Sequence, residues 1–145
     1  MKKSLLAVVL ASLLAVGFIK PAAAQTELHM TWWGSQNRHD RTIKVIEMYE
    51  AANPGVKITY EFANFNDYWT KLNTQAAGNE LPCIMQQDYA YVAEWANRGL
   101  LAPLDEYYKG AIDTTNVNQS ILDSGKVNDH YYALSLGSNS QSIII

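Results

Sequence analysis

The sequence contains a single cysteine, Cys83, among its 145 residues. One thiol cannot close an intrachain disulfide, so the class of small secreted domains held together by disulfides is excluded. An unpaired cysteine between apolar neighbours behaves as a small hydrophobic side chain, and we expect Cys83 to be buried and unreactive.

Positive charge is also scarce. Of the 11 basic residues, Lys2, Lys3 and Lys20 precede Gln25, which leaves 8 basic against 14 acidic residues and a formal charge of about −6 from Gln25 onward. Nucleic-acid binding requires a basic surface that neutralises phosphates. The charge balance therefore excludes nucleic acid as the expected partner.

Signatures of metal sites and of nucleophilic catalysis are missing. His29, His39 and His130 lie too far apart for a metal-binding spacing, and we expect core or surface roles for them. The Gly-Ser pairs at 34–35 and 137–138 lack the surrounding pattern of a nucleophile elbow. We expect no metal, no cofactor and no enzyme activity.

The N-terminus has the three parts of a secretory signal peptide. Lys2 and Lys3 are followed by an uncharged run from Ser4 to Ile19 and then by small residues up to Ala24. A membrane anchor is the alternative, but the run is short for about 30 Å of hydrocarbon. No cysteine follows the run to accept a lipid. We expect cleavage after Ala24 and a periplasmic protein from Gln25 to Ile145.

Hydrophobic periodicity predicts three strands and three helices in alternation. Residues 28–33 and 56–62 alternate with a period of two, the second with one polar side as at a sheet edge, and residues 81–87 form a short buried strand. One helix is expected at 38–52. A second is expected to begin after a cap at Asn66, and a third after a cap at Asp88, with Gly99 just past the end of the third helix. Their expected buried faces are Val45, Ile46, Tyr49 and Ala52, then Tyr68, Trp69, Leu72 and Ala76, then Val92, Trp95 and Ala96.

Such alternation predicts an α/β fold with a mainly parallel sheet flanked by helices. After Pro103 the pattern weakens. We expect a short helix at 120–124 and a hairpin of residues 126–127 and 131–136 around Asn128-Asp129. Asp105-Glu106 and Asp129 are expected in solvated turns.

Ligands of open parallel sheets bind beyond the carboxyl ends of the strands. Three segments follow those ends, and each combines rings with amides or carboxylates, the groups that cover sugar faces and bond sugar hydroxyls. The candidate site residues are Trp33, Ser35 and Arg38, then Phe65, Asn66 and Asp67, then Gln87, Asp88 and Tyr89.

Other roles remain open for these residues. The rings can be core residues and the short polar side chains only helix caps. Arg38 opens a helix, where a cation opposes the helix dipole; it can hold an acidic sugar or pair with Asp40 or Asp67. Asp67 and Asp88 can also be the acid and base of a secreted carbohydrate-active enzyme. An exposed aromatic patch would instead favour an adhesion or scaffold module.

Six segments carry a further signal through their order and spacing: residues 28–34, 49–58, 68–72, 81–85, 98–105 and 132–137. Together they resemble family 1 extracellular solute-binding proteins of carbohydrate ABC importers. One departure is Cys83, where the family usually has an acidic residue.

The resemblance implies a periplasmic-binding-protein-like lobe of type II, an extracytoplasmic monomer that closes on a sugar or oligosaccharide by hinge motion and delivers it to a membrane permease. Family members have two lobes, so residues 25–145 are expected to be the first lobe up to the first hinge crossing, incomplete and without the second lobe. Asn139, in the approach to the hinge, is a further ligand candidate implied by the resemblance.

Overall fold

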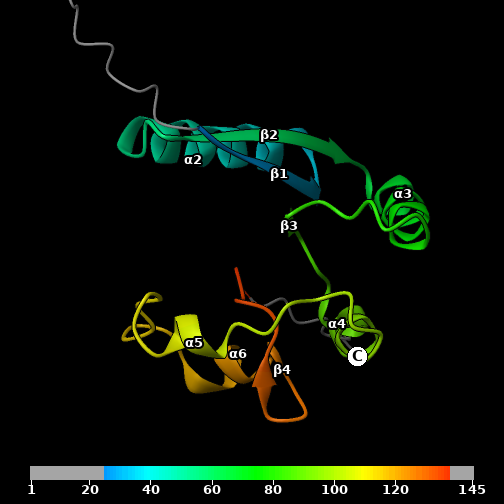
Figure 1. Ribbon diagram of the computed structural model, residues 1–145, viewed down its shortest axis with the longest axis vertical. Coiled ribbons are helices and arrows are strands. Elements are labelled where there is room, and N and C mark those ends of the chain that lie inside the picture. The colour runs from blue at the N-terminus through cyan, green and yellow to red at the C-terminus, as the bar shows by residue number, and fades with distance from the viewer. Residues whose placement is uncertain (1–24, 138–145) are drawn as a thin grey trace, which may run out of the picture.

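The computed structural model describes residues 25–137 (Figure 1). The predicted signal peptide at 1–24 and the candidate Asn139 lie outside these residues. Within them, no helix has the length and the apolar character needed to cross a membrane.

Three parallel strands form the main sheet. β1 (Thr26–Trp33) lies between β2 (Val56–Ala63) and β3 (Ile84–Met85), giving the order β2-β1-β3. β1 pairs with β2 along its whole length, whereas β3 meets it only at Met30 and Thr31. The parallel sheet and the edge position of β2 were both predicted from the sequence and are confirmed, and β3 is shorter than expected.

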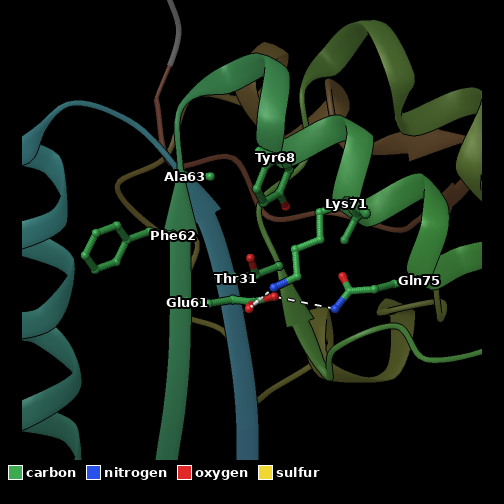
Figure 2. A pocket seen from close by; sticks show the side chains of 8 residues that line it. Thr31, Glu61, Phe62, Ala63, Tyr68, Lys71 and Gln75 are labelled. Carbon is green, nitrogen blue, oxygen red and sulfur yellow. Dashed lines mark hydrogen bonds and ion pairs between the residues drawn. The ribbon is translucent and has the colours of Figure 1, made fainter.

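Helices α2 (Gln36–Ala52) and α3 (Phe65–Ala77) cover opposite faces of the sheet (Figure 2). Neighbouring tryptophans at the end of β1 show the alternation: Trp32 packs with Ile46 of α2, and Trp33 packs with Tyr68 of α3. The period of two along the strand thus divides the hydrophobic core into two layers.

The buried face of α2 differs from the prediction. Ile46 is buried as expected, but Val45 and Tyr49 are 64% and 48% exposed, and Ala52 is exposed too. Polar side chains take the inner face because each has a partner there. His39 Nδ1 accepts a hydrogen bond from Trp32 Nε1 at 3.1 Å, and a Glu50 carboxylate oxygen accepts one from the Ile58 backbone at 2.7 Å.

The predicted faces of α3 and of α4 (Tyr89–Asn97) are confirmed. Tyr68, Trp69, Leu72 and Ala76 form one buried cluster with Trp95 of α4. Val92 and Ala96 of α4 are buried as well. These faces are apolar without exception, so here the hydrophobic pattern alone identifies the buried side.

Helix caps were predicted with mixed success. The Asp88 side chain accepts a hydrogen bond from Ala90 N at 3.0 Å and caps α4, and Gly99 past its end has φ +70°. Both were expected. Asn66, however, lies inside α3, because the helix begins earlier and Asn64 is the cap, accepting from Asp67 N at 3.0 Å.

The chain after α4 forms α5 (Asp105–Tyr108), α6 (Gln119–Asp123) and a hairpin of β4 (Lys126–Val127) and β5 (His130–Tyr131). The helix at 119–123, the hairpin and its turn were predicted, and Asn128 and Asp129 have φ of 50° and 67° as a tight hairpin turn requires. The second strand ends at Tyr131, earlier than expected.

Two further expectations were wrong. Asp105 does not lie in a solvated turn, because it is the first residue of α5. Its carboxylate accepts a hydrogen bond from Tyr131 N at 3.2 Å and is hydrogen-bonded to His130 Nδ1 at 3.1 Å. These two contacts hold the hairpin. Glu106 is also helical and pairs with Lys109 at 2.6 Å. Cys83 is exposed, because β3 begins only at Ile84 and leaves it outside the core.

Candidate functional site

The carboxyl ends of the three strands lie at one edge of the sheet. This follows from the parallel pairing of β1 with both neighbours. The strands end at Trp33, Ala63 and Met85, so the three predicted loops begin side by side. We call this edge the rim, defined as residues 33–38, 64–67 and 86–89.

Trp33 belongs both to the rim and to the core. Its ring centroid lies 5.5 Å from that of Phe65, 5.1 Å from Tyr68 and 5.8 Å from Trp69. Trp33 remains partly accessible, whereas Tyr68 is almost fully buried. The core role considered for these rings therefore holds for Tyr68, and Trp33 combines packing with an accessible face.

A network of hydrogen bonds fixes the segment after β3. Tyr68 donates its hydroxyl to Gln86 O at 2.6 Å, and Gln86 N donates to Thr31 O at 3.0 Å. Burial raises the pKa of the Tyr68 phenol, so this group stays a donor at ordinary pH. The sequence did not identify either contact, since both join residues far apart along the chain.

Arg38 pairs with neither Asp40 nor Asp67, and no salt bridge of Arg38 is found among residues 25–137. Its guanidinium donates to Trp33 O at 3.4 Å. The Gln86 side-chain amide lies beside both Arg38 and Trp33. In the orientation that satisfies both contacts, the amide oxygen of Gln86 accepts a hydrogen bond from Arg38 at 3.3 Å, and the amide nitrogen donates one to Trp33 O at 3.2 Å. The guanidinium is thus held at the rim by neutral groups.

Gln87 has the most unusual environment of the predicted site residues. Both polar atoms of its side-chain amide are buried, and neither has a hydrogen-bond partner in the described part of the chain. Buried amides are nearly always hydrogen-bonded, and an orphaned one needs an explanation.

The two rim carboxylates already serve local structure. Asp67 accepts from the Asn64 amide at 2.6 Å, and Asp88 Oδ1 caps α4. Ser35, Asn66 and Tyr89 are exposed, with Tyr89 at 77%. Ser35 makes no capping bond through its side chain. The cap role considered for the polar residues thus holds for Asp88, while Tyr89 presents a free ring.

A small cavity between the sheet and α3 lies apart from the rim candidates (Figure 2). Its volume is about 40 Å³, and Glu61 of β2 points into it beside Lys71 and Gln75 of α3. Ligand sites are usually several hundred Å³, so this space suits water and no sugar. This cavity was not predicted from the sequence, although the position of Glu61 on the polar side of a strand was a signal for it.

The Glu61–Lys71 pair predicts acid sensitivity. Partial burial raises the pKa of Glu61, but the hydrogen bond and charge of Lys71, with the charge of His29, bring it below its ordinary value of 4.5. The pair's stabilisation is then complete above about pH 4.5 and is lost as the pH falls through the lower folded value. Lys71→Met is expected to cost up to about 1 kcal/mol at pH 7 and less at pH 3, measured by urea unfolding across that range.

Lys109→Met is the matched control, because its partner Glu106 is 82% exposed at the surface. Its difference from the wild type should be smaller than that of Lys71→Met at pH 7. Equal and pH-independent effects of the two substitutions would contradict the role assigned to Glu61.

Comparison with known proteins identifies what the chain is similar to. A family model described as bacterial extracellular solute-binding protein matches residues 44–145. A family 1 extracellular solute-binding protein of Alicyclobacillus acidocaldarius shares 34% sequence identity, with a TM-score of 0.67 over 74% of this chain and 27% of its own.

Two other solved structures are similar. An ABC substrate-binding protein of Listeria monocytogenes, in complex with cycloalternan, has 27% identity and a TM-score of 0.67, over 74% of this chain and 28% of its own. A periplasmic oligogalacturonide-binding protein of Yersinia enterocolitica, in complex with saturated digalacturonic acid, has 24% identity and a TM-score of 0.67, over 74% and 26%, and shows the fold alone. The chain spans about a quarter of the length of these relatives.

Proposed function

This chain belongs to the family of bacterial extracellular solute-binding proteins, and from that premise we propose that it serves as the sugar-binding component of an ABC importer. Its α/β fold, with a parallel sheet flanked by helices, is the fold of the solved family members. The proposed ligand is a sugar or oligosaccharide, captured without covalent chemistry and passed to a membrane permease. The proposed location is the periplasm, after removal of residues 1–24.

The observation that carries the proposal is the composition of the rim. Rings and amides from three loops meet at one sheet edge, and Gln87 brings there an amide with no partner of its own. A sugar presents apolar ring faces together with hydroxyls that donate and accept hydrogen bonds. The relative from Listeria monocytogenes, an ABC substrate-binding protein solved in complex with cycloalternan, supports a substrate-binding role.

We assign roles to the rim residues within this proposal. Trp33 and Tyr89 supply stacking surfaces, and Gln87 and Asn66 bond to hydroxyls. Asp88 can also accept from a hydroxyl, since only its Oδ1 is used in capping α4. The remaining candidates are Ser35, Arg38, Phe65, Asp67 and, outside the described residues, Asn139.

The relatives also bear on how the cleft is completed. This chain covers 26–28% of their length, and we propose that residues 25–145 correspond to the first lobe of such a protein. A second lobe would then form the opposite wall of the cleft, and closure about a hinge would enclose the sugar. A single wall is expected to bind weakly.

Titration with a panel of neutral and acidic oligosaccharides tests the function. Binding should change tryptophan fluorescence, because Trp33 lies at the rim and touches Trp69, and calorimetry gives the affinity. The sugar must be recovered unchanged, since an enzyme built on Asp67 and Asp88 would release shorter products. The absence of any heat or fluorescence change across the panel, from the product of the complete reading frame, would reject a sugar ligand.

A further inference from the structure

A groove lies between α3 and α4 on the side of α3 that faces away from Glu61. Its volume is about 340 Å³, which is within the range of ligand sites. Phe65 and Asn66 stand at its rim end, and Trp69 and Asn73 continue it along α3. Tyr91 and Glu94 form the α4 side.

The walls of the groove contain aromatic side chains, and two of these are exposed to solvent. Phe65 and Tyr91 are 41% and 36% exposed. Tyr91 meets Trp69 edge to face with centroids 4.4 Å apart, and Trp69 in turn lies 6.2 Å from Phe65. A continuous row of rings therefore runs from the rim into the groove.

Polar groups accompany these rings. The side chains of Asn66 and Asn73 are exposed on the same side of α3. The charge of Glu94 is balanced by Arg98, whose guanidinium lies 2.9 Å away. The Trp69 indole nitrogen is buried and lacks a hydrogen-bond partner among the described residues.

From this arrangement we propose that the groove binds further units of a neutral oligosaccharide whose first units occupy the rim. The inference rests on the proposed sugar-binding function and deepens it. Rings spaced among amides match a polyhydroxylated chain, whereas an apolar peptide would leave both asparagine amides desolvated without partners. The neutral Glu94–Arg98 pair offers no unbalanced charge to an acidic ligand.

The test uses a series of neutral oligosaccharides of one linkage, from two units to about six, with NMR shifts and calorimetry as readouts. Longer members should shift the side-chain amide of Asn73 and the Trp69 indole N–H, and should bind about 10-fold more tightly than the disaccharide. Asn73→Ala and Tyr91→Leu should remove the gain with length and leave disaccharide affinity unchanged. Leucine keeps an apolar cover over Trp69.

Two substitutions outside the groove serve as controls. Thr74→Ala replaces an exposed threonine of α3, and Tyr107→Leu replaces an exposed tyrosine of α5. Both should keep the full dependence on length. Shifts confined to the rim residues Asn66, Gln87 and Tyr89, with equal affinity for all lengths, would overturn the groove and leave the proposed function standing. An absence of shifts with every sugar of every linkage would overturn both.

Discussion

Replacing Gln87 by methionine is expected to stabilise the free protein by about 1–2 kcal/mol while lowering its sugar affinity about 10- to 100-fold. The side-chain amide is buried with both polar atoms unpartnered, and such a group costs about 1–3 kcal/mol in the folded state. Methionine has similar length and flexibility without polar atoms, so it removes this cost without opening a cavity. The same change removes the amide that we propose to bond to sugar hydroxyls.

Unfolding by urea and titration with the best-binding sugar measure the two effects separately. Gln75→Met is the matched control: its amide bonds weakly to Glu61 at 3.5 Å, on the sheet side of α3 and away from the rim. It should leave affinity unchanged. A Gln87→Met protein that is less stable and binds sugar as the wild type does would show that the amide serves the fold and does not touch the ligand.

The sequence predicted the fold where packing follows hydrophobic pattern alone. The stripes of α3 and α4 were correct because every inward position, such as Leu72 and Trp95, is apolar. The face of α2 was wrong because His39 and Glu50 turn inward to bond Trp32 Nε1 and Ile58 N. A polar residue is recognisable as a core residue only when its partner is known, and the partner comes from another element.

The site shows the same division. The meeting of three loops at the rim followed from strand alternation and is a property of the parallel sheet. The cap of α3 was predicted at Asn66, but the helix starts two residues earlier and Asn64 is its cap. A difference of this size is not recognisable from the local sequence. The hydroxyl of Tyr68 on Gln86 O joins α3 to the segment after β3, so no local pattern predicts it.

Tyr68 connects the two parts of the proposed ligand surface. Its ring packs against Trp33, and its hydroxyl holds the backbone of Gln86, next to Gln87. Trp69 beside it lines the groove between α3 and α4. One turn of α3 therefore positions rim and groove together, which explains why rings so close to a sheet end are both packed and partly accessible.

Gly125→Ala is expected to destabilise the protein by about 3 kcal/mol, a large effect for the addition of one methyl group. A Cβ atom at this position would lie 2.0 Å from Ala133 O and 3.0 Å from Ala133 C, both backbone atoms that cannot rotate away. The close approach is built by the hydrogen bond from Tyr132 N to Gly125 O at 2.9 Å. Relief of the overlap must break this bond and separate α6 from the chain after β5.

Thermal and urea unfolding measure the loss, with Gly110→Ala as control. An added Cβ at Gly110 meets no atom within 4 Å, so its effect should stay within about 0.5 kcal/mol. The damage should also reach the rim, because Asn128 of the hairpin turn donates to Asn97 at the end of α4, the helix that begins with Tyr89. Sugar affinity of Gly125→Ala should therefore fall although residue 125 lies outside both ligand surfaces, and an unchanged melting temperature would show that this backbone contact is absent in solution.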